Sequence, residues 1–242
     1  MNTPRTLPVL LFALALACPA AEPPATPALA PDLREIVNLP ELEFPLQLLH
    51  RGYTTGEVRL LVKISADAHL LDALVTNYTH KAFADVALAA LNRSTFRPLR
   101  IDGKPVITVT ELIVQFQSDG PIAVEHHTGE GSAAWPDTYA YEPCDPARLD
   151  RPLQPLAVRA PLYPKNLCEQ GVAGTVVVEF FIDETGRVRM PTVCEAQNDL
   201  LAGLTLLAVE QWRFSPPSSR NQPVLVRVRQ KFDFQPEKLG QG

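Results

Sequence analysis

The chain has few aromatic side chains and no block of basic residues. Aromatic residues make up 7% of its 242 positions, and 22 Lys and Arg stand against 27 Asp and Glu, for a formal net charge of −5. Binding of nucleic acid or of an anionic membrane surface needs clustered positive charge, and base stacking needs aromatic platforms. The composition therefore argues against nucleic acid as a partner. Its 46% apolar content is that of a soluble globular protein.

Motifs of enzymatic chemistry are missing as well. The sequence contains no Cys-x-x-Cys and no Gly-x-Ser-x-Gly, and the Gly-rich stretch 129–134 lies outside any β-α-β pattern. Asp183-Glu184 fits a turn better than a catalytic acid pair. The one group of metal-ligand types is Glu125-His126-His127 with Glu130. It lies in a linker-like segment, where adjacent histidines of an extended chain point apart. We expect no enzyme activity, no metal site and no cofactor.

Residues 1–21 predict an export signal. Arg5 supplies the positive start, and the apolar run Leu7–Ala17 is too short to span a bilayer. Residues 14–18, LALAC, resemble a bacterial lipobox loosely, and in that case Cys18 would be lipidated. Ordinary cleavage after Ala17 fits nearly as well. The periplasm is thus the expected location, and attachment as a lipoprotein through Cys18 stays open.

One pattern occurs twice in the chain, at an offset of 118 residues. The landmarks that coincide include Gly56 with Gly174, Ile64 with Ile182, Ala90 with Ala208, and Phe116 with Phe234. The matches fall at turns and core-type positions, so the repeat indicates duplicated structure. It predicts a Pro-rich tether at 22–32, a first domain at 33–117, a connector at 118–158, a second domain at 159–236 and a tail at 237–242. Trp135, Tyr139 and Tyr141 of the connector are expected to pack against the domains.

Each copy predicts the order α-β-β-α-β. In the second copy, helices are expected near 165–170 and 200–212, and strands at 175–183, 187–194 and 223–234. The turn Asp183–Gly186 joins the first two strands, and Pro191 marks an edge or a bulge. The second helix is expected to bury Leu201, Leu204, Ala208 and Trp212.

The first copy predicts the same elements near 46–51, 57–65, 70–76, 81–94 and 105–116. Its last strand carries Ile107, Val109 and Ile113 on the face that is charged in the second copy, so we expect that face to be covered. The fold class is therefore α+β: two small domains, each a three-stranded antiparallel sheet with two helices on one face.

The second copy resembles the C-terminal domain of TonB-family energy transducers. The resemblance rests on Tyr163-Pro164, Gly171, Gly174, the run Val176–Asp183 (VVVEFFID), Gly186-Arg187-Val188, Trp212–Pro216 (WRFSP) and the strand from Pro223 to Phe234. The first copy is a degenerate version, in which Phe44 replaces Tyr163 and Ser94 replaces Trp212.

The resemblance implies a periplasmic domain that binds an outer-membrane receptor and is linked to transmembrane transport. A short extended segment of the receptor would add as a strand to the sheet. The sequence shows neither an N-terminal transmembrane anchor nor a long Pro-Lys/Pro-Glu spacer, so the resemblance bears on fold and binding mode more than on energy transduction. The alternative is a structural or assembly lipoprotein that self-associates through edge strands, as a homo-oligomer.

The hairpin and Pro191 together predict the strand order two-one-three, with strand 223–234 as an open edge. We expect the partner to bind along that edge and near the Tyr-Pro pair. The expected partner-binding residues are Val224, Leu225, Val226, Arg227, Val228, Arg229, Gln230, Lys231, Phe232, Tyr163 and Pro164. Structural roles are the stronger interpretation for Tyr163-Pro164 and for the basic stripe Arg227, Arg229 and Lys231. The hairpin also predicts a disulfide between Cys168 and Cys194, with Cys144 as the rival partner for either.

Overall fold

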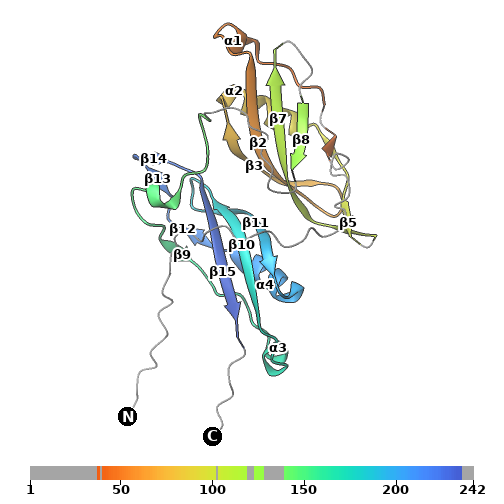
Figure 1. Ribbon diagram of the computed structural model, residues 1–242, viewed down its shortest axis with the longest axis vertical. Coiled ribbons are helices and arrows are strands. Elements are labelled where there is room, and N and C mark those ends of the chain that lie inside the picture. The colour runs from red at the N-terminus through yellow and green to blue at the C-terminus, as the bar shows by residue number, and fades with distance from the viewer. Residues whose placement is uncertain (1–36, 39, 102, 119–122, 128–138, 236–242) are drawn as a thin grey trace, which may run out of the picture. The chain divides into compact units, whose positions relative to one another are not determined.

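The computed structural model describes residues 37–38, 40–101, 103–118, 123–127 and 139–235, which belong to one compact unit (Figure 1). The expected export signal, Cys18 and the tether lie outside the described residues. No helix among these residues is long and apolar enough to cross a membrane. The described part of the chain is α+β, with two large antiparallel sheets, four two-stranded pairs and few helices. Each of the two large sheets forms a subdomain together with its helices.

The second subdomain contains α3 (Lys165–Glu169), β10 (Gly174–Ile182), β11 (Val188–Ala196), α4 (Asp199–Val209) and β15 (Val226–Phe234). Its strand order is β11-β10-β15, all antiparallel. The predicted order two-one-three is therefore confirmed, and β15 is an edge of the sheet. Pro191 lies in the outer strand β11, at the register irregularity between the pairs Glu179↔Thr192 and Phe181↔Arg189. This position suits a residue that has no N–H to donate.

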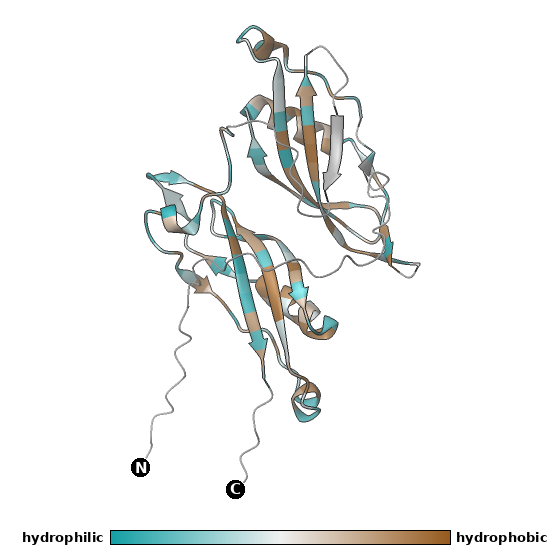
Figure 2. Ribbon diagram, viewed as in Figure 1, coloured by the Kyte–Doolittle hydropathy of each residue, from teal (hydrophilic) through white to brown (hydrophobic). Residues whose placement is uncertain are grey.

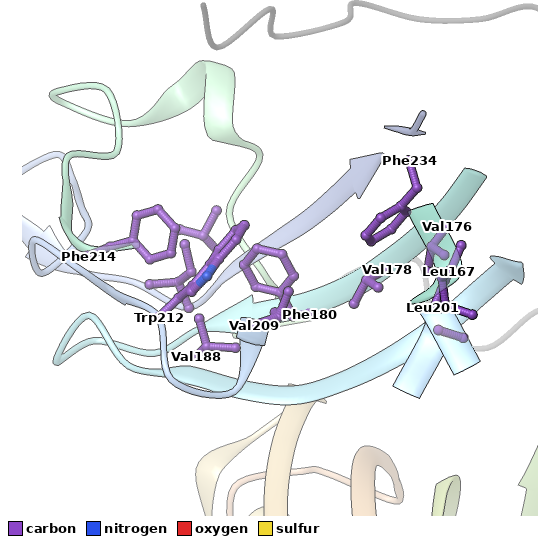
Figure 3. Packing of buried hydrophobic residues seen from close by; sticks show 13 residues of the cluster. Leu167, Val176, Val178, Phe180, Val188, Leu201, Val209, Trp212, Phe214 and Phe234 are labelled. Atoms are coloured by element: carbon purple, nitrogen blue, oxygen red, sulfur yellow. The ribbon is translucent and has the colours of Figure 1, made fainter. Parts of the chain in front are cut away.

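Alternate residues of β10 bury an apolar core beneath the two helices. Val176, Val178, Phe180 and Ile182 are fully buried, and they pack with Leu167 of α3 and Leu201 of α4. At one end of this core, Trp212 lies between Phe180 and Phe214 (Figure 3), with ring centroids 6.0 and 6.2 Å away. The Trp212 indole N–H donates to the Arg159 carbonyl at 2.8 Å, so its polar atom is satisfied.

The buried face of α4 differs from the prediction. The helix buries Leu201, Ala202, Thr205 and Val209, whereas Leu204 and Ala208 are only partly buried. Because α4 is apolar almost all round, hydrophobic spacing alone does not identify its inner face. The Thr205 hydroxyl donates to the Leu201 carbonyl at 2.7 Å, which allows a polar residue to lie on the buried side. Asn198 caps the helix by accepting from Leu200 N and Leu201 N.

The first subdomain repeats this order and adds one strand. It contains α1 (Leu46–Leu49), β2 (Thr55–Ile64), β3 (Leu70–Tyr78), α2 (Lys81–Leu91), β7 (Thr108–Gln117) and β8 (Ala123–His127). Its strand order is β3-β2-β7-β8, so the expectation of a three-stranded sheet is wrong here. The extra strand β8 comes from the predicted connector. It was missed because the segment is short and has no clear apolar alternation.

The remaining described elements are short strand pairs and one 3-10 turn. The pairs are β1 (Val37–Asn38) with β4 (Thr95–Phe96), β5 (Leu99–Ile101) with β6 (Lys104–Val106), β9 (Pro155–Ala157) with β12 (Arg213–Phe214), and β13 (Ser218–Ser219) with β14 (Gln222–Pro223). The 3-10 turn spans Pro146–Arg148. Of the predicted connector, the structure describes residue 118, β8 and the residues from Tyr139 onward.

Two predictions about covered surfaces are confirmed in part. On the predicted apolar face of the first subdomain, Ile113 is buried and Val109 is partly buried, but Ile107 is exposed, so that face is not covered at its beginning. Val109 packs against a small cluster that includes Phe181, Met190 and Leu225 of the second subdomain. Tyr141 stacks on Tyr78, with centroids 5.0 Å apart. Of the other two aromatic residues of the connector, only Tyr139 is described, and its hydroxyl donates to the buried Glu57 carboxylate. Trp135 lies outside the described residues.

The predicted disulfide between Cys168 and Cys194 is not formed, and Cys144 is free as well. The register passes from Val177↔Glu195 to Val178↔Val193, which makes Cys194 the extra residue of a bulge. Cys194 is exposed beside Arg229, on the sheet face away from the helices. Cys168 lies in α3 near Tyr163, on the helix side. The two thiols therefore lie on opposite faces of the sheet.

Candidate strand-receiving edge

Backbone groups of β15 point alternately toward β10 and away from it. Asp183 N donates to Arg187 on the β11 side, so the neighbouring Ile182 faces β15, where its register partner is Val226. On β15, the Leu225 carbonyl faces outward, because it accepts from Cys144 N at 2.7 Å. By alternation, the outward N–H and C=O groups beyond this point belong to Arg227, Arg229, Lys231 and Asp233.

The start of this edge is already occupied. Cys144 forms an isolated parallel bridge to Val226 in addition to its hydrogen bond with Leu225. Among the described residues, no strand pairs with the outer side of β15 beyond Val226. The predicted edge Val224–Phe232 is therefore shortened at its beginning, and its open part starts at Arg227. Sequence reasoning missed the role of Cys144; its flanking prolines, Pro143 and Pro146, were a sign of a fixed segment.

Polar residues colour much of the β15 ribbon (Figure 2), and the two faces of the strand have different character. Val226 and Phe234 are buried against the helices, and Val228, Gln230 and Phe232 of the same face are partly buried. The opposite face carries Arg227, Arg229, Lys231 and Asp233, all exposed. The inner face anchors the strand in the core, which leaves the backbone edge and the basic side chains accessible.

The basic side chains have acidic neighbours on their own sheet. Arg227 donates to Glu179 of β10 at 2.8 Å, and Lys231 lies 3.1 Å from Asp233. Arg229 approaches Cys194, and this contact raises the pKa of the guanidinium. Exposed pairs of this kind contribute little stability. They can therefore exchange partners without much cost, so an incoming carboxylate can compete for them.

The Tyr163-Pro164 pair has a structural role. The Tyr163 hydroxyl donates to the Val172 carbonyl at 2.5 Å, and its ring meets Phe234 edge-on with centroids 5.6 Å apart. Pro164 is the residue that precedes α3, and its carbonyl accepts from Leu167 N. The pair thus fixes α3 against the last residue of β15. It supports the edge from one end without being part of it.

A cleft of about 720 Å³ opens beside the beginning of the open edge. Its lining includes Arg227 and Arg229 of β15, Glu179 and Phe181 of β10, and Cys144. The mixed charge and the exposed guanidinium groups suit polar side chains of a bound segment better than an apolar small molecule. Within the described part of the chain, no group of three His, Cys, Asp or Glu is placed to hold a metal ion.

Comparison with known proteins identifies the second subdomain. Residues 159–236 match the family model for the Gram-negative bacterial TonB protein C-terminal region. Protein TonB of Vibrio cholerae serotype O1 is 29% identical over 93 residues, which is 38% of this chain and 38% of that protein. The matched part thus spans well under half the length of the curated relative.

Two solved structures are similar as well. The solution NMR structure of the Pseudomonas aeruginosa TonB C-terminal domain is 30% identical and covers 36% of this chain and 88% of that one, with a TM-score of 0.32. A structure of the TonB2 protein from Vibrio anguillarum is 20% identical and covers 45% of this chain and 96% of that one, with a TM-score of 0.29. Together with the family match, the residues that form β10, Gly186, Trp212 and β15 identify 159–236 as a TonB C-terminal domain.

Proposed function

We propose that this protein binds an extended segment of an outer-membrane receptor, or of another envelope protein, by strand addition to β15, as part of a transport process. The observation that carries the proposal is the outer edge from Arg227 to Asp233 in a TonB C-terminal domain. Main-chain hydrogen bonds along such an edge supply affinity, and side-chain contacts supply specificity. The protein works by binding in this proposal and catalyses no reaction.

The charge of the edge favours an acidic or mixed segment. Arg227, Arg229 and Lys231 line one side of the edge in a protein of net charge −5. Opposite charges in directly facing positions of neighbouring strands each contribute roughly 0.2–1 kcal/mol. A segment with Asp or Glu at alternate positions would therefore gain at each facing pair.

The proposal is tested by replacing one outward-facing residue of β15. Arg229→Pro removes an N–H group that faces away from β10, whereas Arg229→Ala removes the same side chain and keeps that group. We expect the full chain and Arg229→Ala to capture the same outer-membrane receptor from envelope extracts. Arg229→Pro should capture at least tenfold less of it, as quantified by mass spectrometry.

Circular dichroism of both variants is the control for folding. Val226→Pro and Val228→Pro are poorer tests, because their N–H groups face β10 and their loss weakens the sheet itself. Equal capture by a folded Arg229→Pro variant would show that the edge is not the site. If the chain captures only further copies of itself, that result would favour the self-associating alternative over receptor binding.

A further inference from the structure

The edge of β7 in the first subdomain corresponds to the edge of β15 but is already paired. Gly56 lies opposite Phe116 and Gly174 lies opposite Phe234, so both subdomains share one register between their first and last strands. In the first subdomain, β8 runs antiparallel to β7 along Glu111–Gln115. The offset of 118 residues places this stretch at Arg229–Asp233 of β15. The chain therefore adds a strand of its own where the second subdomain leaves its edge open.

Alternation shows which backbone groups hold β8. The Glu57 carbonyl accepts from Thr79 N on the β3 side, so the next residue, Val58, faces β7 at Val114. The neighbouring Ile113 of β7 then faces β8, where its register partner is Glu125. The backbone groups of Glu125 thus point toward β7, and those of its neighbour His126 point away.

β8 is held on one side only among the described residues, where β7 is its single strand partner. It has five residues against the ten of β7, so parts of the β7 edge remain unpaired on either side of it. Short strands paired on one side open at low free energy relative to the rest of a sheet. β8 is therefore suited to be replaced.

The two edges differ in charge at corresponding positions. Glu111 of β7 corresponds to Arg229 of β15, and Ile113 corresponds to Lys231. The register places His127 opposite Glu111 and Val124 opposite Val114. By the rule that opposite charges in facing positions attract, β7 selects a basic residue where β15 selects an acidic one.

We propose that the outer edge of β7 is a second strand-receiving site, closed in the resting protein by β8 and opened when an extended peptide replaces it. The peptide that fits has a basic residue opposite Glu111 and a β-branched residue opposite Val114. The inference rests on the proposed function only for strand addition as the mode of binding. The protein then recognises two different segments, one at each edge.

Because β8 is attached to β7, it competes with any added peptide for the β7 edge. Residues 118–122 join β7 to β8, and a short connection gives the attached strand an effective concentration of about millimolar. A peptide in solution must compete with it, so its measured affinity for the parent protein is lower than for a protein whose β8 cannot pair. Opening the edge should therefore reveal binding that is hidden in the parent.

The experiment measures binding of a fluorescent peptide with the sequence of residues 121–129, PIAVEHHTG, to the full chain. Glu125→Pro removes a donor that faces β7, and His126→Pro is the matched control whose lost donor faces away. By fluorescence anisotropy we expect Glu125→Pro to bind at least tenfold more tightly than the parent and than His126→Pro. In the Glu125→Pro protein, a peptide with Lys in place of His127 should bind more tightly, and one with Asp more weakly.

Two further variants keep the result decisive. If circular dichroism shows that Glu125→Pro is unfolded, the double variant Val124→Gly, Glu125→Gly replaces it, because it weakens β8 without removing a donor. The same order of affinities is expected. Adding Arg229→Pro should leave peptide binding within twofold. Loss of binding on that addition would place the peptide on β15 and overturn the inference while leaving the proposed function intact. Equal binding by the parent and the opened variants would overturn it as well.

Discussion

Gly186 lies at a position where any residue with a side chain would be strained. Its φ angle is +82°, and a Cβ atom there would lie 2.0 Å from the carbonyl oxygen of Phe214. The Gly186 carbonyl also accepts from Phe214 N at 2.8 Å, which holds the hairpin turn against the segment after α4. Backbone geometry and space both require glycine here. The corresponding turn of the first subdomain uses Ala68 at φ +63°, where the repeat lacks this glycine.

Gly186→Ala should destabilise the second subdomain by at least about 2 kcal/mol, because the energetic cost of the left-handed conformation adds to that of the collision with Phe214. The matched control is Gly203→Ala in α4, where a Cβ atom would meet nothing within 4 Å. That change should raise the free energy of unfolding by about 0.5–1 kcal/mol. Urea denaturation followed by Trp fluorescence measures both. Equal effects of the two changes would contradict this account of Gly186.

The hairpin between β10 and β11 depends on the Asp183 carboxylate. One of its oxygens accepts from Thr185 N at 2.9 Å, from the Thr185 hydroxyl at 2.6 Å and from Arg187 N at 3.0 Å. Burial acts to raise the pKa of Asp183, but these hydrogen bonds and the nearby Arg189 outweigh it, and the pKa lies below its ordinary value. The charged form is therefore favoured by the folded state.

A lowered pKa makes the contribution of Asp183 depend on pH. It is fully present above the pKa of the unfolded chain, about 3.9, and is lost as the pH falls through the folded value. Asp183→Asn should therefore be less stable than the parent at pH 7, and the difference should shrink progressively below about pH 4. Thermal unfolding at a series of pH values measures it. A difference that stays constant down to pH 2 would contradict the role of the charge.

Much of the order of helices and strands follows from residues that restrict the backbone conformation. Asp183 to Gly186 predicts its turn, Pro191 predicts an irregular outer strand, and these two together predict the strand order. The inner face of α4 does not follow in the same way, because a helix that is apolar all round is oriented only by tertiary packing. The bulge at Cys194 is likewise set by the sheet, and a count along ideal strands misplaces its thiol.

The candidate site could be predicted only in part. The alternation of Val226 and Phe234 with Arg227 and Arg229 identified an edge strand with one basic face, and the structure has that face exposed. The Cys144 pairing and β8 both come from the connector, where local patterns are weak. The partners Cys144 and Val226 are also far apart in sequence, and such a pairing depends on contacts that no local pattern reports.

At the scale of the whole molecule, Arg189 connects the two sheets. It donates from Nε to Asp72 of β3 at 2.8 Å and from Nη2 to the Ala73 carbonyl at 3.1 Å, and its Nη1 lies 3.6 Å from Asp183. Beside it, Leu74 of β3 packs in one buried cluster with Met190. These contacts give the two subdomains a shared ion pair and a shared apolar cluster, so we expect them to unfold together.

Arg189→Met should weaken this coupling. The substitution keeps an apolar stem and removes the guanidinium, which leaves Asp72 without that partner, at a cost of about 1–3 kcal/mol. Differential scanning calorimetry should show one transition for the parent, and two transitions or a broadened one for Arg189→Met. The exposed pair Lys81–Asp85 provides the control, because Lys81→Met breaks a pair that is solvated on α2 and should leave a single transition. Two transitions already present in the parent would refute the shared unfolding.

The Cys144 pairing makes the open edge of β15 a strand of fixed length. An incoming segment that runs along the edge meets the connector at Leu225 and Val226 and can extend no further in that direction. From Arg227 to the end of β15 at Phe234, a bound segment has room for roughly 25 Å of extended chain. In the proposed binding mode, this edge therefore limits the length of the bound segment as well as selecting its charge. A segment of suitable chemistry would end at one defined residue, and that end would set its register on the edge.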